Sequence, residues 1–507
     1  MGRKISPDLF QLIQSMKQAE KRYFKIFSRR HTIGEGNNYL ALFDAIGRQK
    51  TYDEKALLQE NRFLRPSLFP DQKHHLYNLV LRAMATYACG KTADSELHFL
   101  LDCAEVLHKK GLYLQARKLL ASAKKLALKL EKGLVYIDCL EREKKIELLL
   151  FNLKTSPAWL DAINREIERT TAQLAVDQAY GRLSEEMYFI LVSETYVRSE
   201  KNTLRSKKIM SHPLMKTPPT ASLRSRFNFH RTHSLYYYIS ADFRRYYEHC
   251  KVIADLLGQH PAVLSESPKA HIVALQNLLI AQKNLRLYDE LFVTLKHLKK
   301  FESGPIDIRA QVFAIAHDIE LTIYIDTGQF EKGALLAGTI SRGLDQYKEY
   351  ISPSHELLFY FNVAYNFIGC GNYRKALTWL NKMVNHPKAH SALPFVFHMA
   401  HLVLLIVHYE LGNTDLVEYR MRTVAKTFSK KHELYDLENV LFAFLSKAVI
   451  AEPKTLGQLR KKLFRDLDNL HADPEKRGAF FTFDFLAWAE SFVSGRTMSE
   501  ILQNREH

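Results

Sequence analysis

Apolar residues recur along most of the chain at steps of three and four residues. One clear run consists of Leu112, Ala116, Leu119, Ala123, Leu126 and Leu130. This spacing places the apolar side chains on one face of an α-helix, where they can pack against a neighbouring element. The pattern predicts a fold built mainly from amphipathic helices.

A short turn motif interrupts these helical patterns. It consists of a glycine, an aromatic residue two positions later and a small residue three positions after that. The three clear copies are Gly111, Tyr113 and Ala116; Gly328, Phe330 and Gly333; and Gly371, Tyr373 and Ala376. Including weaker copies, the aromatic residues Phe243, Tyr288, Phe330 and Tyr373 are separated by 45, 42 and 43 residues. These intervals indicate a repeating unit of that length.

Each part of the motif has a physical role. Glycine can take the left-handed conformation that ends one helix and turns the chain into the next. We expect the aromatic residue to pack back on the preceding helix, and the small residue to let two backbones approach closely. A single helix pair cannot bury its apolar face, whereas stacked pairs can, which is the principle of an α-solenoid.

These turns resemble those of the tetratricopeptide-repeat family, at low identity over roughly residues 96–450. The repeat is longer than the ~34 residues typical of that family, so we expect extended helices. The resemblance implies an all-α, right-handed superhelical solenoid of helix hairpins. It also implies a concave face, lined by the first helix of each pair, that holds a peptide or a protein segment.

The repeat divides the chain into three predicted parts. Residues 1–95 lack the motif and predict a helical cap, residues 96–455 the solenoid, and residues 456–507 capping helices that cover the last repeat. The helices expected in the cap are Pro7 to Ser28, Tyr39 to Arg48, Tyr52 to Asn61 and Asp71 to Ala88. The last three could form a helix-turn-helix, and an end cap is the plainer alternative.

Composition and charge limit the classes of function. Of the 507 residues, 47% are hydrophobic and 25% charged, which is typical of a folded protein, and only 20 are glycine. The net charge of +17 favours polyanions or acidic proteins as partners. The longest apolar run, Leu402 to Val407, is too short to span a membrane, and the first residues lack an apolar signal core. We therefore expect a cytoplasmic protein without a membrane span.

The basic charge is concentrated between Arg198 and Lys251, where twelve Lys and Arg residues face three Asp and Glu residues. The candidate partner-binding residues are Arg224, Arg226, His230, Arg231, His233, Tyr237, Tyr238, Arg244 and Arg245. On a helix, Arg226, His230, His233 and Tyr237 share one stripe, while Phe229, Tyr236 and Ile239 would face the core. Arginine beside aromatic residues can hold an acidic peptide or stack on bases. A solvated basic helix with its tyrosines in the core is the alternative.

Other chemistry is weakly indicated. A metal site in the cluster His386, His390, His398, His401 and His408 would need imidazoles that converge, usually with a carboxylate or another acceptor beside them, and no such acceptor is apparent locally, so we expect no metal site. Gly90-Lys91-Thr92 matches a relaxed phosphate-loop pattern, but a true loop follows a strand and is rich in glycine, so we expect a helix stop at Gly90 and an N-cap at Thr92 instead. No catalytic motif is found, none of the five cysteines lies in a CxxC pair, and we expect no cofactor.

The sequence thus predicts a non-enzymatic scaffold that binds an acidic or amphipathic protein segment. The alternative is a nucleic-acid-binding regulator in which the N-terminal cap reads the nucleic acid and the solenoid acts as a sensor. The dependence of affinity on salt distinguishes these alternatives, because binding to nucleic acid falls steeply as salt rises. The sequence does not predict the oligomeric state.

Overall fold

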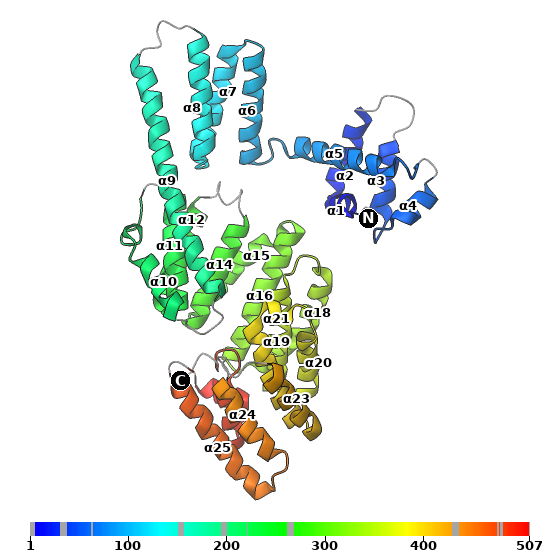
Figure 1. The fold of residues 1–507 in the computed structure, drawn as a ribbon, viewed down its shortest axis with the longest axis vertical. Coiled ribbons are helices and arrows are strands. Elements are labelled where there is room, and N and C mark those ends of the chain that lie inside the picture. The colour runs from blue at the N-terminus through cyan, green and yellow to red at the C-terminus, as the bar shows by residue number, and fades with distance from the viewer. Residues whose placement is uncertain are drawn as a thin grey trace. The chain divides into compact units, whose positions relative to one another are not determined.

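The structure is a computed structural model that describes residues 6–30, 38–61, 64–150, 157–193, 200–220, 222–260, 268–427, 435–473, 476 and 480–505. All regular elements in these ranges are helices (Figure 1), so the predicted all-α class is confirmed. The chain forms two compact units, Met1–Ala172 and Gln173–His507. The domain boundaries near residues 95 and 455 stay predictions.

The first unit begins with a group of five helices around its own core. They are α1 (Asp8–Ser15), α2 (Gln18–Arg30), α3 (Asn38–Arg48), α4 (Glu54–Glu60) and α5 (Phe69–Ala88). Their core includes Ile13, Phe24 and Phe43. The single helix predicted from Pro7 to Ser28 is wrong, because Met16 takes an extended conformation and separates α1 from α2. The Glu20 carboxylate then accepts from the Lys17 backbone N–H at 2.6 Å, which satisfies a donor at the start of α2.

Three antiparallel helices follow in the first unit, α6 (Ala93–Lys109), α7 (Tyr113–Lys129) and α8 (Gly133–Leu149). Thr92 begins α6 with a capping box that it shares with Ser95, so its predicted role as an N-cap is confirmed. Gly111 has a φ of 72° and connects α6 to α7. The long helix α9 (Pro157–Ser193) begins in this unit and continues into the second.

The second unit consists of helix hairpins followed by a C-terminal group of helices. Its first part contains α10 (Glu200–Met210), η1 (Pro213–Met215), α11 (Leu223–Ile239), α12 (Phe243–Gln259), α14 (Pro268–Asn284), α15 (Tyr288–Lys299), η2 (Lys300–Ser303), α16 (Ile306–Asp326), α17 (Phe330–Leu335) and α18 (Ala337–Gln346). Its second part contains α19 (Pro353–Gly369), α20 (Tyr373–Val384), α21 (Ala389–Ala392), α22 (Pro394–Glu410), α23 (Thr414–Thr427), α24 (Tyr435–Ala448), α25 (Pro453–Ala472), α26 (Phe485–Ser494) and α27 (Met498–Asn504).

A left-handed residue joins the two helices of several hairpins. Gly328 and Gly371 have φ values of 64° and 69°, as the motif predicts. The amide after Gly371, that of Asn372, donates to the Phe367 carbonyl at 2.8 Å, which closes the helix end. In the weaker copies, Ala241 and Arg286 take the same conformation with φ values of 55° and 57°. The turn therefore recurs where its glycine does not.

The aromatic and small residues of the motif do not all pack as expected. The Tyr113 ring lies 5.4 Å from the His108 ring of the preceding helix, as predicted. Phe330 instead packs on the following hairpin, where a Cβ added to Gly369 would lie 2.2 Å from the Phe330 ring. A Cβ on Gly333 would lie 1.9 Å from the Asn366 side chain. Here the small residues let successive hairpins approach closely.

Polar side chains also join successive hairpins of the second unit, about one repeat apart. The Lys283 ammonium lies 3.0 Å from the Asp326 carboxylate, 43 residues later. The Tyr247 hydroxyl donates to Glu290, again 43 residues later. The Asn362 amide donates to Asp318 at 2.9 Å across 44 residues. Equivalent positions of neighbouring hairpins therefore meet at the predicted interval.

Candidate partner-binding surface

The predicted stripe of α11 is present, but it faces the second helix of its own hairpin. The Nδ1 atoms of His230 and His249 of α12 lie 2.9 Å apart. The His249 ring also stacks on His233 and Tyr237, with centroids 4.8 and 5.6 Å away. The Arg245 guanidinium lies 5.4 Å from the centre of the Tyr237 ring. These side chains form one continuous stack between α11 and α12.

Burial keeps the imidazoles of this stack neutral. It lowers the pKa of His230 to about 4 and that of His249 to about 3. Burial also lowers the pKa of His233, whose Nδ1 lies 3.0 Å from the Phe229 carbonyl oxygen. Neighbouring imidazoles and Arg226 add to the shifts, since like charges disfavour a further proton.

The same positions contact each other in another hairpin. Tyr360 and Trp379, also 19 residues apart, have ring centroids 5.8 Å apart across α19 and α20. At the turn of that hairpin the Lys375 ammonium lies 5.5 Å from the centre of the Phe367 ring. Arg245 and Tyr237 make the matching cation–ring contact in the α11–α12 hairpin. His230, His233 and Tyr237 therefore occupy packing positions of the hairpin. His249 was not among the predicted residues, although its 19-residue offset from His230 could have identified it.

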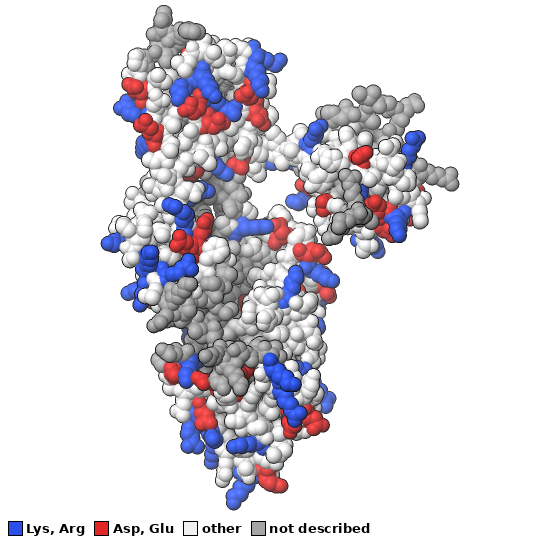
Figure 2. Space-filling view, viewed as in Figure 1, with Lys and Arg blue, Asp and Glu red and all other residues white. Residues whose placement is uncertain are grey.

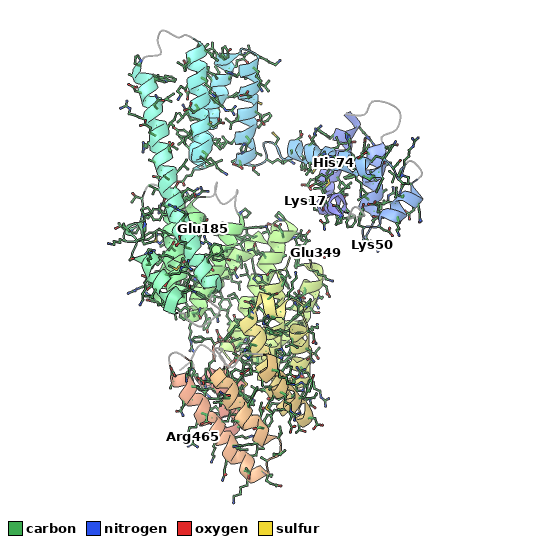
Figure 3. The ribbon with its side chains drawn as sticks, in the orientation of Figure 1. Lys17, Lys50, His74, Glu185, Glu349 and Arg465 are labelled. Carbon is green, nitrogen blue, oxygen red and sulfur yellow. The ribbon has the colours of Figure 1, made fainter. Side chains whose placement is uncertain are left out.

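Arg231 lies on another side of α11, against α9. Its Nη1 donates to the Ser184 hydroxyl at 3.3 Å, and its guanidinium lies 5.4 Å from the centre of the Tyr188 ring. Burial lowers the pKa of Arg231, and the nearby Glu185 of α9, labelled in Figure 3, opposes that shift. This arginine thus joins α9 to α11.

The remaining candidate residues are at least partly exposed. Arg224, Arg244 and Arg245 are exposed, Arg226 is partly exposed, and Tyr238 is 37% exposed. Arg244 and Arg245 have acidic neighbours on their own helix turn, Glu248 at 3.5 Å and Asp242 at 3.6 Å. In the part of the chain that the structure describes, no carboxylate lies within ion-pair distance of Arg224 or Arg226.

Arg224 and Arg226 lie in a stretch of the chain that contains no acidic residues. From Lys201 to Ala241 the sequence has eight Lys and Arg residues and no Asp or Glu. We call residues 201–241 the acid-free segment. It includes α10, which exposes Arg205, Lys207 and Lys208 around Leu204, itself 67% exposed. Elsewhere, Lys and Arg lie interspersed with Asp and Glu over much of the visible face (Figure 2).

A buried carboxylate beside the start of α11 already has hydrogen-bond partners on that helix. Asp177 of α9 is 7% exposed and accepts hydrogen bonds from the hydroxyls of Ser222 and Ser225. Ser222 also caps α11 by accepting from the Ser225 backbone N–H at 3.0 Å. Asp177 therefore fixes the first turn of α11, and Arg224 projects from this turn to solvent.

The histidines of α22 have separate partners. His398 lies 2.8 Å from Glu438 of α24, and both are buried. Arg420 donates to His408 at 3.0 Å, and burial lowers the pKa values of His401 and His408 to about 4. Among the described residues, no three His, Cys, Asp or Glu side chains converge as metal ligands would.

A small cavity of about 250 Å³ lies between α6 and α8 in the first unit. Its lining includes Glu105, His108, Asp138, Arg142 and Lys145, over a floor with Leu120. Arg142 lies 3.1 Å from Glu105 and 2.9 Å from Asp138, so its charge is largely compensated within the cavity.

Every helix in the described part of the chain is too short or too polar to span a lipid bilayer. No protein-family model, curated protein or solved structure matches the chain significantly.

Proposed function

We propose that the protein is a non-enzymatic scaffold that captures an acidic, amphipathic protein segment along the acid-free segment. The observation that carries this proposal is the exposure of Arg205, Lys207, Lys208 and Arg224 without local carboxylates. Such cations are open to charge-assisted hydrogen bonds with a partner's carboxylates. The proposed partner is acidic for that reason.

The apolar part of the proposed partner follows from α10. Leu204 is 67% exposed and is flanked by Arg205 and Lys208 on the same short helix. A partner helix with acidic residues around an apolar stripe would match this arrangement. Tyr238 adds a partly exposed ring at the end of α11.

As the framework for this site, we propose a right-handed solenoid of tetratricopeptide-like hairpins with an N-terminal helical cap. Its support is the left-handed turn that recurs at Ala241, Arg286, Gly328 and Gly371, together with the links between side chains 43 or 44 residues apart. Stacked hairpins bury faces that one hairpin leaves open, so the array holds α11 rigidly.

Charge reversal tests the proposed site. The double variant Arg224→Glu, Arg226→Glu changes the charge by four units at the start of α11. Lys461→Glu, Lys462→Glu makes the same change at two exposed positions of α25 and is the matched control. We expect quantitative affinity capture to lose a defined set of acidic proteins by about tenfold with the first variant only. Equal recovery with both variants would contradict the proposal.

Nuclease treatment separates the alternative function. Lys17, just before α2, and Arg22 and Arg29 on α2 are exposed, and a nucleic-acid reader could use them. If capture depends on nucleic acid and the affinity falls steeply with salt, the protein is the regulator rather than the scaffold. Capture that survives nuclease supports the scaffold.

A further inference from the structure

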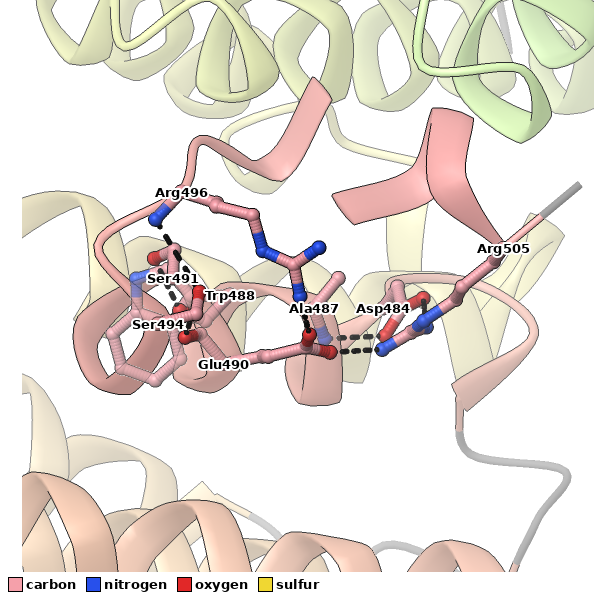
Figure 4. Close-up of polar contacts among 8 residues, drawn as sticks. All are labelled: Asp484, Ala487, Trp488, Glu490, Ser491, Ser494, Arg496 and Arg505. Atoms are coloured by element: carbon pink, nitrogen blue, oxygen red, sulfur yellow. Dashed lines mark hydrogen bonds and ion pairs between the residues drawn. The ribbon is translucent and has the colours of Figure 1, made fainter. Parts of the chain in front are cut away.

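The last helices form a hairpin that is closed by its own ion pairs. Arg505 bonds Asp484 at 2.7 Å and Glu490 at 2.9 Å, and Arg496 bonds Glu490 at 2.9 Å (Figure 4). Gly495 makes the turn between α26 and α27 with a φ of 72°. We call residues 483–505 the C-terminal hairpin. These ion pairs link α26 to α27, and α26 also packs along α25.

This hairpin reaches back over much of the second unit. The Asp484 backbone N–H donates to the Tyr365 hydroxyl of α19 at 3.0 Å, across 119 residues. The Trp488 indole N–H donates to Glu410 at the end of α22 at 2.7 Å. The Ser499 hydroxyl donates to the Gly328 carbonyl at 2.5 Å, across 171 residues. The hairpin therefore contacts hairpins well before the last repeat, which residues 456–507 were predicted to cover.

The receiving surface is shaped for this contact. A Cβ added to Gly328 would lie 2.7 Å from the Ser499 carbonyl oxygen, whereas one added to Gly371 or Gly412 would meet nothing within 4 Å. All three glycines occupy the same turn of the repeat. Only the turn at Gly328 thus depends on glycine for close approach to another segment as well as for its φ.

The contact combines apolar burial with a consistent hydrogen-bond direction. Phe483 and Trp488 are buried, and the Phe483 ring lies 4.6 Å from the Tyr365 ring. At each polar contact the C-terminal hairpin donates, and the receiving surface accepts through Tyr365, Glu410 or the Gly328 carbonyl. We call the surface formed by these three groups the acceptor surface.

We propose that the C-terminal hairpin is a built-in ligand of the acceptor surface. The surface then recognises a helical segment that carries an aromatic residue, an acidic N-cap and a tryptophan four residues after that cap. In this chain these residues are Phe483, Asp484 and Trp488. A partner with the same pattern must displace the chain's own hairpin before it can bind.

The experiment weakens the binding of the C-terminal hairpin within the full chain and then adds the same segment as a free peptide. Trp488→Ala removes a fully buried ring, which lowers the affinity of the hairpin for its site about a hundredfold or more. A tethered segment competes at an effective concentration in the millimolar range. A labelled synthetic peptide of residues 480–507 should therefore bind the Trp488→Ala chain at least tenfold more tightly than the unchanged chain.

Two controls make the result specific. Trp379→Ala removes a buried ring from α20 without touching the hairpin, so this chain should bind the peptide no better than the unchanged chain. A peptide that itself carries Trp488→Ala should not bind. Failure of the intact peptide to bind a folded Trp488→Ala chain, or equal binding to the Trp379→Ala chain, would overturn the proposal.

If Trp488→Ala prevents folding, hydrogen exchange of another variant carries the test. Gly328→Ala should speed exchange of the α27 amides about tenfold while the α19 amides stay protected, because the added Cβ meets Ser499. Gly371→Ala is the matched control and should leave α27 unchanged. The same exchange pattern in both variants, or joint loss of protection in α19 and α27, would show that the hairpin is not a separable ligand.

Discussion

The Nδ1 atoms of His230 and His249 face each other at 2.9 Å, so one imidazole donates an N–H to the lone pair of the other. A second proton between them would point two N–H groups at each other and leave no acceptor. Burial already lowers the pKa values to about 4 and about 3, and each ring lies close to His233 as well. The α11–α12 hairpin is therefore held by a neutral histidine pair.

This pair makes stability depend on pH. In the unfolded chain histidine has a pKa near 6.5, above its value in the fold, so the unfolded state binds protons first as the pH falls. The contribution of these neutral histidines to the free energy of unfolding is therefore fully present above pH ~6.5, and it is lost as the pH falls towards 4. With allowance for partial solvation, we expect His230 alone to contribute a loss of roughly 1–2 kcal/mol at pH 5. Urea unfolding of the second unit at pH 7.5 and pH 5.0 measures this loss of stability.

Replacement of His230 identifies the source of the effect. His230→Phe places an aromatic ring where α19 has Tyr360, facing the equivalent of Trp379. We expect this variant to lose less stability between pH 7.5 and pH 5 than the unchanged protein. An identical pH dependence in both proteins would show that other buried histidines, such as His401 and His408, determine it.

The left-handed turns predict opposite effects of glycine substitution. Gly371→Ala introduces a Cβ at a φ of 69° in open space, so only backbone strain opposes it. We expect a loss of about 1–2 kcal/mol. Arg286→Gly removes a similar strain at a φ of 57°, but glycine increases the entropy of the unfolded chain. Stability should then rise slightly or stay unchanged in urea titrations, and a loss above ~1 kcal/mol would contradict this account of the turn.

The first turn of α11 depends on the buried carboxylate of Asp177. Ser225 is fully buried, and its hydroxyl donates to that carboxylate. Ser225→Ala leaves a buried charge with one fewer donor, so we expect a loss of about 1–3 kcal/mol in the free energy of unfolding. Ser211→Ala, at an exposed position, is the control and should be nearly neutral. Equal effects of the two substitutions would remove the structural role given to Asp177.

Much of the fold follows from local sequence. The turn motif at Gly111, Gly328 and Gly371 identified left-handed helix ends because glycine is favoured in that conformation. The turns at Ala241 and Arg286 were harder to identify, since tertiary packing holds non-glycine residues there. The break between α1 and α2 was missed because it depends on backbone conformation at Met16 rather than on a helix-breaking residue.

The candidate site was only partly predictable. The basic character of the region is a property of the sequence, and helix periodicity is enough to group His230, His233 and Tyr237 on one side of α11. Which helix the stripe faces depends on the hairpin, so the burial of His233 against His249 required the structure. The return of the C-terminal hairpin to Gly328 joins residues 171 positions apart and has no local signal.

Zero-length carbodiimide cross-linking of the unmodified protein shows whether hairpins about 43 residues apart stack on each other. Lys283 and Asp326 lie 3.0 Å apart on neighbouring hairpins, close enough for an amide bond to form between them. Mass spectrometry should find that cross-link in the monomer and lose it in the Asp326→Asn variant. Cross-links from Lys283 to carboxylates outside the next hairpin, with none to Asp326, would contradict the account.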